Sequence, residues 1–170
     1  YDKNMGKGYA IKKGVEKATG EYIIFMDADL STDLNAINEA LENLKLYDIV
    51  IGSRNLKESN VSNKTISRKI VSKCCNFLIK IICNLNYADT QCGFKAFRTN
   101  KIKEIVKLQE INRFAFDVEY LYIASLKKYS VKEIPVIWKD DRDSRVNIIK
   151  SSLRFFKDII KIKKNSKHYI

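Results

Sequence analysis

The sequence predicts an α/β sandwich whose central sheet is mainly parallel. Two patterns alternate along the chain: apolar residues at helical spacing, and short continuous apolar runs typical of strands buried on both faces. The chain has 170 residues, 45% of them hydrophobic and 31% charged, with one proline and six glycines. This length and composition suit one folded domain and exclude collagen-like, Pro-rich and disordered material.

Helices are expected in six segments. The first, 8–18, has apolar residues at helical spacing, and Gly20 is suited to end it. The second, 33–44, carries an apolar stripe, and Thr32 or Asp33 is suited to cap it. The other four are expected at 64–85, 100–108, 117–128 and 148–163.

Strands are expected at four apolar runs, 22–26, 48–52, 93–97 and 131–138. Pro135 predicts that the last strand lies at an edge or bends. No uninterrupted apolar stretch approaches the roughly 18–20 residues that a transmembrane helix needs. The first residues also lack the basic and then apolar pattern of a signal peptide. We therefore expect neither a secreted nor an integral-membrane protein from the chain as given.

The charge balance indicates an anionic partner. Lys and Arg number 32 against 20 Asp and Glu, which gives a formal net charge of +12. From Arg142 to the end there are nine basic and two acidic residues, so most of the excess lies there. A basic end attracts phosphates of nucleic acids, nucleotide sugars or anionic lipids, and charge alone does not distinguish among them.

Cysteine and histidine do not form a metal-binding pattern. Four cysteines lie at spacings unlike those of zinc sites, and the one histidine, His168, lies near the end of the chain. Zinc sites need about four well-placed ligands, so we expect no structural zinc. Free and mostly buried thiols of a cytosolic protein are expected instead.

Paired carboxylates follow the first expected strand. Asp27 and Asp29 lie two residues apart, where the mouth of the sheet is expected. Their oxygens are the ligands that Mg²⁺ and Mn²⁺ prefer, and such an ion can hold a diphosphate and neutralise a departing phosphate. A strand-end loop with a helix-capping Asp has the same sequence pattern, so the pair alone does not establish a metal site.

Two enzyme classes place such a pair after an apolar strand. In phosphatases of the haloacid-dehalogenase type the first Asp is a nucleophile. Ser31 fits that motif loosely, and Asp140 and Asp141 resemble its second acidic pair. In nucleotide-sugar glycosyltransferases the pair holds the metal on the diphosphate. The two carboxylates leave both classes open.

Arginine and serine residues further along the chain predict a phosphate site. Arg54 ends the second expected strand, and Arg68 and Ser72 share one helix face because they are four residues apart. Guanidinium and hydroxyl groups on one face suit a phosphate monoester. A solvated basic helix face is the plainer interpretation of that segment alone.

Several motifs, in order, resemble family 2 glycosyltransferases that glycosylate polyprenyl phosphates. They are DADLS, GSR, SRKIVS, DTQCGFKAFR and FAFDVE, beginning at Asp27, Gly52, Ser67, Asp89 and Phe114. The segments DTQCGFK and FAFDVEYLYIA are most similar to those of dolichyl-phosphate β-glucosyltransferases. The resemblance runs from about Asn4 to about Val146 and implies a GT-A-like three-layer sandwich.

The resemblance implies a role for each motif. A Mg²⁺ or Mn²⁺ ion would be held by Asp27 and Asp29. The catalytic residues that line the reaction centre would be Asp29, Asp89 and Gln91. The donor would be bound by Gly6, Lys7, Asp27, Arg142 and Arg145. The acceptor phosphate would be bound by Arg54, Arg68 and Ser72. Asp117 and Glu119 could orient the sugar or the Arg cluster. The alternative is that they belong to a capped helix start, where their carboxylates are solvated.

The implied reaction moves glucose from UDP-glucose to a polyprenyl (dolichyl) phosphate in one inverting step. The attacking phosphate oxygen is already anionic, so no strong general base is required. The enzyme then has to position two anions and stabilise the leaving UDP. GDP-mannose as donor, an undecaprenyl acceptor and a Mg²⁺-dependent phosphatase are the alternatives. A nucleic-acid-binding module would not explain the carboxylates Asp27 and Asp29 at the end of the first expected strand.

The resemblance also divides the chain. Residues 1–146 would form a catalytic domain that lacks its N-terminal strands and its uracil-binding loop, so we expect the chain to be inactive alone. Residues 147–170 would form a basic amphipathic helix. This helix and the apolar end of helix 64–85 have the pattern of membrane-surface helices. The implied location is the cytosolic face of the endoplasmic reticulum, or of the plasma membrane in a prokaryote.

Overall fold

The computed structural model describes residues 3–62, 66–139 and 148–170. Six α-helices lie in these ranges, as the apolar spacing predicted, and a short 3₁₀ helix, η1 (Asn165–Lys167), follows the last of them. The six are α1 (Lys7–Lys17), α2 (Ala36–Leu44), α3 (Ile66–Cys83), α4 (Thr99–Leu108), α5 (Phe116–Leu126) and α6 (Ile148–Lys164). α2 begins later than expected because the Asp33 carboxylate accepts the N–H of Asn35 and forms a turn there.

The strands form two sheets. The central sheet contains β1 (Tyr22–Phe25), β2 (Ile49–Ser53), β4 (Lys95–Arg98) and β5 (Val131–Pro135), and the second pairs β3 (Asn60–Ser62) with β6 (Ile137–Lys139). The expected strand 131–138 thus divides at Val136, whose N–H donates to Ser59 Oγ. Pro135 ends an edge strand where the chain passes to the second sheet, as its position predicted.

The α/β sandwich is confirmed, but its central sheet is mixed rather than mainly parallel. β1, β2 and β5 point the same way, whereas β4 lies between β1 and β2 and runs antiparallel to both. The first three residues of β4 are buried, as are all five of β2, whereas β1 is buried on one face and half-buried on the other. A continuous apolar run reports this burial but not the direction of the strand, which is why the sequence did not show the reversal.

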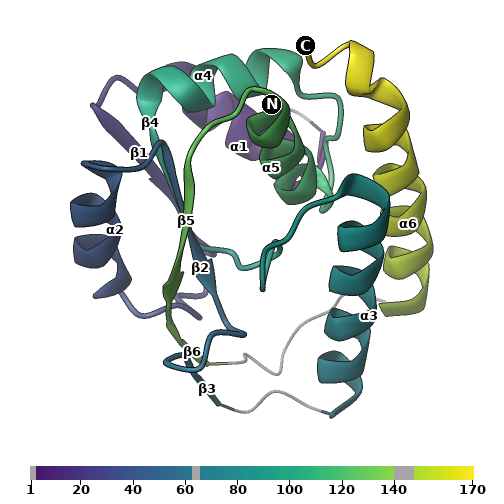
Figure 1. The fold of residues 1–170 in the computed structure, drawn as a ribbon, viewed down its shortest axis with the longest axis horizontal. Helices are drawn as coiled ribbons and strands as arrows, with labels where there is room; N and C mark the ends of the chain where they lie inside the picture. Colours follow the sequence, from purple (N-terminus) through teal and green to yellow (C-terminus); the bar gives the residue numbers. More distant parts are fainter. Residues whose placement is uncertain (1–2, 63–65, 140–147) are drawn as a thin grey trace.

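Helices cover both faces of the central sheet (Figure 1). Side chains alternate along β2: Ile49 and Ile51 face α1, α4 and α5, whereas Val50 faces α2. On the face covered by α1, α4 and α5, aromatic rings from the sheet and from α5 pack together. The ring centroids of Phe25 and Phe97 are 5.7 Å apart. This core fixes the strand ends from which the site is built.

α5 is buried on all sides. Every residue of 116–124 is buried, so the expectation of a solvated helix start for Asp117 and Glu119 is wrong. Glu119 accepts two backbone N–H groups from residues 110–111 and the hydroxyl of Tyr169, which lies 2.7 Å away. Buried polar groups need such partners, and here they come from a loop and from the C-terminal end.

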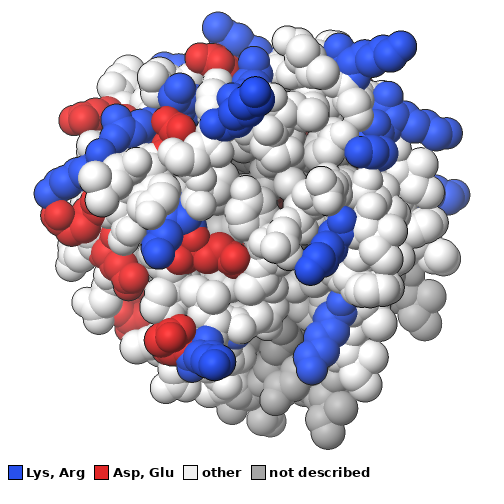
Figure 2. Space-filling model, in the orientation of Figure 1, with Lys and Arg blue, Asp and Glu red and all other residues white. Residues whose placement is uncertain are grey.

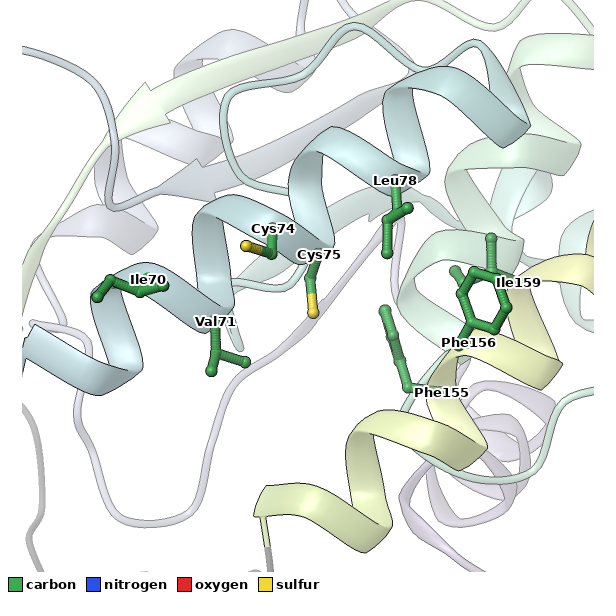
Figure 3. Close-up of a pocket in the computed structure, with 8 residues that line it drawn as sticks. All are labelled: Ile70, Val71, Cys74, Cys75, Leu78, Phe155, Phe156 and Ile159. Carbon is green, nitrogen blue, oxygen red and sulfur yellow. The ribbon is translucent and has the colours of Figure 1, made fainter.

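α3 and α6 lie side by side at the edge of the molecule (Figure 1). They enclose an apolar pocket of about 260 Å³, into which Cys75 and Leu78 of α3 and Phe155 of α6 point (Figure 3). Of the four free cysteines, two are buried and Cys74 is exposed. None of the helices within the described ranges is long and apolar enough to cross a membrane.

Candidate active site

Three chain segments converge at the edge of the sheet where β1 and β2 end. β1 leads to Asp27, β2 leads to Arg54, and the segment 89–94 leads into β4. The first residue of β4, Lys95, pairs with Phe25 of β1 and with Ile51 of β2. Because β4 is antiparallel, its beginning lies beside the ends of its neighbours. Motifs far apart in the sequence therefore meet at one edge.

Asp27 is held on both sides. Its Oδ1 lies 2.5 Å from the Nζ of Lys7, and the two side chains are 35% and 29% exposed respectively. Its Oδ2 lies against Gly93, where an added Cβ would come within 1.8 Å. Any residue larger than glycine at this position would displace the carboxylate, which explains the glycine in the DTQCG motif.

Asp29 lies on an exposed turn beyond Asp27. Its Oδ1 accepts the backbone N–H of Ser31 at 3.0 Å, and Leu30 between them has a φ of 53°. No set of three or more His, Cys, Asp or Glu side chains within the described ranges is placed to hold a metal. Two carboxylates still fit a hard cation that keeps water and substrate phosphate oxygens as its other ligands, as Mg²⁺ commonly does.

A buried ion pair lies behind Asp27. The Nζ of Lys95 donates to Asp117 Oδ1 and to the carbonyl of Cys92, both at 2.7 Å, and the Lys95 side chain is fully buried. The contact with Cys92 ties the loop that carries Gly93 to α5. Lys7 lies in the field of the same carboxylate. Burial alone would lower the pKa of Lys7, but Asp117 and Asp27 outweigh burial and raise it.

Arg54 and Asp89 form a second ion pair, in which Asp89 is buried and the Arg54 side chain is 14% exposed. Arg54 Nε lies 2.6 Å from Asp89 Oδ2, Nη2 lies 3.0 Å from Oδ1, and the Arg54 backbone N–H also donates to Oδ2. The guanidinium lies 5.2 Å from the centre of the Trp138 ring. Burial alone would raise the pKa of Asp89, but Arg54 outweighs it and lowers the pKa. These contacts fix the direction of the guanidinium.

Some of the remaining candidate residues lie near this site, and others lie outside the described residues. Gly6 precedes α1 with a φ of 108°, and its N–H donates to Asn4 Oδ1. Gln91 lies beside the Arg54 pair, since its backbone N–H donates to Asp89 Oδ1. Ser72 is half-buried on α3. The Arg68 side chain and all of Arg142 and Arg145 lie outside the described residues.

Three contributors to this site do not stand out in the sequence. They are Lys95, Trp138 and Gly93, the last of which is one position of the DTQCG motif. A signal for Lys95 exists, because it is the charged residue of an otherwise apolar strand segment, GFKAF. Trp138 carries no such signal, since its contact with Arg54 depends on how β6 follows β5.

The fold and the site define the class of the protein. The match to the family Glycosyl transferase family 2 covers residues 2–106, and the chain belongs to this family. The mixed sheet with helices on both faces is a GT-A-like fold.

Among characterised relatives, the chain is similar to dolichyl-phosphate β-glucosyltransferases. It is 34% identical over 167 residues to the one from Dictyostelium discoideum and 33% identical over 169 residues to the one from Homo sapiens. These matches cover 94% and 95% of this chain but 51% and 52% of those proteins. The chain thus spans about half the length of these relatives.

Solved structures with the same fold include glucosyl-3-phosphoglycerate synthase from Mycobacterium tuberculosis. Its complex with UDP superimposes with a TM-score of 0.64 at 11% identity, covering 94% of this chain and 55% of that one. Its complex with Mn²⁺, UDP and glucosyl-3-phosphoglycerate gives a TM-score of 0.66 at 10% identity, covering 93% and 55%. At this identity the likeness establishes the fold.

Proposed function

We propose that the protein containing this chain transfers glucose from UDP-glucose to a polyprenyl phosphate, such as dolichyl phosphate, with inversion at the sugar. The observation that carries the proposal is the meeting of the carboxylate pair Asp27 and Asp29 with an anchored Arg54 at one sheet edge. A cation site and an anion site side by side suit a diphosphate leaving group and a phosphate nucleophile. The similarity to dolichyl-phosphate β-glucosyltransferases supports glucose as the sugar and a polyprenyl phosphate as the acceptor.

In this reaction the protein has to position the two substrates, and it does not have to transfer a proton. A phosphate oxygen of the acceptor forms the new bond to the sugar while the bond to UDP breaks, and no proton has to be removed first. Arg54 would orient this phosphate, with its guanidinium held by Asp89. Further acceptor contacts are proposed for Arg68 and Ser72. The reaction centre is assigned to Asp29, Asp89 and Gln91, and the donor to Gly6, Lys7, Asp27, Arg142 and Arg145.

A divalent cation, Mg²⁺ or Mn²⁺, would be held by Asp27 and Asp29. When bound, it neutralises charge on the diphosphate that leaves with UDP. The two oxygen donors of this site suit either ion. The presence of Mn²⁺ together with UDP in the mycobacterial synthase of the same fold supports this class of cofactor.

A lipid acceptor requires a membrane surface, and α3 and α6 supply the surface that fits it best. Exposed apolar side chains lie along both helices, among them Ile70, Phe77 and Ile81 of α3 and Leu153 of α6. On this side of the molecule Figure 2 shows Lys and Arg among uncharged residues, while Asp and Glu gather on the side of the sheet and α2. Apolar helices with basic flanks bind anionic bilayers, and we place this surface on the cytosolic face of a membrane.

The decisive experiment is a transfer assay with the full-length protein in membranes. Labelled UDP-glucose and labelled GDP-mannose are each offered with dolichyl or undecaprenyl phosphate, with and without Mn²⁺. We expect metal-dependent transfer of glucose into the lipid phase. Asp29→Asn should abolish this transfer, whereas Asp33→Asn, the same chemical change in the turn before α2, should preserve it.

The other outcomes each select an alternative. Transfer of mannose would keep the mechanism and replace the donor. Transfer to undecaprenyl phosphate alone would replace the acceptor. The phosphatase would be favoured if a folded protein transferred no sugar but released phosphate from a phosphomonoester in the presence of metal. Asp27→Asn should then abolish this release.

A further inference from the structure

Lys7 occupies the oxygen that the proposed metal site needs. It is the first residue of α1, and its Nζ lies 2.5 Å from Asp27 Oδ1. The other oxygen, Oδ2, lies closely against Gly93. Packing therefore restricts the approach to Oδ2, and an ammonium group lies at Oδ1. A cation that takes Oδ1 as a ligand meets the charge of Lys7 at short range, and the repulsion favours displacement of Lys7.

The surroundings keep Lys7 close to the site. A lysine side chain ordinarily carries its charge at neutral pH, and here it lies in the field of Asp117, Asp27 and Asp29. The ammonium also lies 6.0 Å from the centre of the Phe116 ring. After Lys7 leaves Asp27, its charge therefore still lies near Asp117. A second cation arriving alone would meet this charge at short range.

We infer that Lys7 competes with the divalent cation for Asp27, so that the cation binds tightly only together with the donor diphosphate. The inference rests on the proposed metal and diphosphate site and adds a coupling role to Lys7. A diphosphate brings the negative charge with which a displaced Lys7 can pair. Two ligands whose binding relieves the same repulsion raise each other's affinity, and this coupling is reciprocal.

The test measures Mn²⁺ binding, without any sugar transfer. Free Mn²⁺ is followed by electron paramagnetic resonance in titrations of the full-length protein, with and without UDP. In the native protein we expect weak binding of Mn²⁺ alone and binding about tenfold or more tighter with UDP. Lys7→Met should tighten Mn²⁺ alone by about tenfold and reduce the effect of UDP by about the same factor, while the direct contact between the metal and the diphosphate remains.

Two variants control this measurement. Lys17→Met removes the same charge from the exposed far end of α1 and should bind Mn²⁺ as the native protein does. Lys7→Arg keeps a charge at the site and should keep both the weak binding and the effect of UDP. If Lys7→Met fails to fold, comparison of Lys7→Arg with Lys7→Gln carries the same test.

The outcomes separate this inference from the proposed function. Suppose that the native protein binds Mn²⁺ with UDP, but Lys7→Met binds Mn²⁺ no more tightly than the native protein does. This result would contradict the competition between Lys7 and the cation and leave the proposed function unaffected. If Lys17→Met tightened Mn²⁺ binding as much as Lys7→Met, the effect would come from net charge, and the competition would again be contradicted. If the native protein did not bind Mn²⁺ even with UDP, both the competition and the proposed metal-dependent function would be contradicted.

Discussion

The Lys95 and Asp117 side chains are 0% and 7% exposed, so their ion pair is out of reach of water. Removal of one partner leaves the other charge buried without compensation. Asp117→Asn should therefore lower the free energy of unfolding by about 3–5 kcal/mol. Lys45→Ala breaks the ion pair between Lys45 and Glu42, in which the two side chains are 61% and 71% exposed, and should change the free energy of unfolding little.

Urea unfolding measures both variants. The double variant Lys95→Met, Asp117→Leu should recover most of the lost stability, because it removes both charges from the core. A loss for Asp117→Asn no larger than that for Lys45→Ala would show that the pair is solvated. A loss in the double variant as large as in the single one would show that packing, rather than charge, had been broken.

The Arg54 pair predicts a dependence of stability on pH. Burial opposes ionisation of Asp89, but Arg54 dominates and holds the pKa of Asp89 below its ordinary value of 3.8. Because this pKa is lower in the folded than in the unfolded chain, the ion pair adds stability above about pH 4. That stability is lost as the pH falls through the folded-state value.

Unfolding free energies measured between about pH 3 and pH 7 test this sign. Arg54→Met should be less stable than the native protein at pH 7, and the difference between the two should shrink as the pH falls. The reason is that Asp89 without Arg54 is a buried carboxylate, which gains from protonation. A difference that stays constant over the whole range would show that Arg54 does not change the pKa of Asp89.

At the scale of elements, the exposed apolar face of α3 is the feature to test. Phe77 and Ile81 are each 63% exposed and lie four residues apart on one side of the helix. Replacing both by Ser should reduce binding to vesicles containing phosphatidylserine about tenfold or more, because less apolar surface enters the interface. The unfolding free energy should stay within about 0.5 kcal/mol, because these side chains are not in the core.

Leu46→Ser is the matched control for this surface. Leu46 is 80% exposed but follows α2, on the other side of the sheet. It should leave vesicle binding unchanged in a sedimentation assay of the full-length protein. Equal losses for Leu46→Ser and for the α3 variant, or no loss for either, would move the membrane contact away from α3.

The elements also show what the sequence could and could not reveal. Helices and buried strands follow from apolar spacing, and all those expected are present in the described residues. The direction of β4 depends on where the chain re-enters the sheet, which no local pattern records. β3, with the sequence Asn60–Ser62, is too short and polar to be recognised, and it forms only because β6 lies beside it.

The same limit applies to the site. Asp27, Asp29 and Arg54 could be found because each follows a predicted strand, and parallel strand ends share an edge. The partners Lys7, Gly93 and Asp117 are positioned by helices and a loop elsewhere in the chain. Their contacts are tertiary, so sequence motifs indicated that these segments matter but not that they touch.

At the scale of the whole molecule, the C-terminal end is part of the main core. Phe155, Ile159, Ile162 and Tyr169 belong to the same apolar cluster as the strands β1 and β2. The hydroxyl of Tyr169 donates to Glu119, which in turn accepts two backbone N–H groups. This chain of contacts connects α6 to α5, and α5 carries Asp117 into the site. We therefore expect α6 to unfold together with the sheet.

Tyr169 tests this cooperativity. Tyr169→Phe removes one hydrogen bond to a buried carboxylate and should cost about 1–3 kcal/mol. Tyr169→Ala also empties part of the core and should cost about 3–5 kcal/mol, whereas Ile170→Ala, at a position 87% exposed, should change little. Amide hydrogen exchange should show both Tyr169 variants accelerating exchange in α6 and in β1 by similar factors, because a cooperative unit opens as one. Acceleration in α6 alone would make this helix an independent surface element whose unfolding is not coupled to that of the sheet.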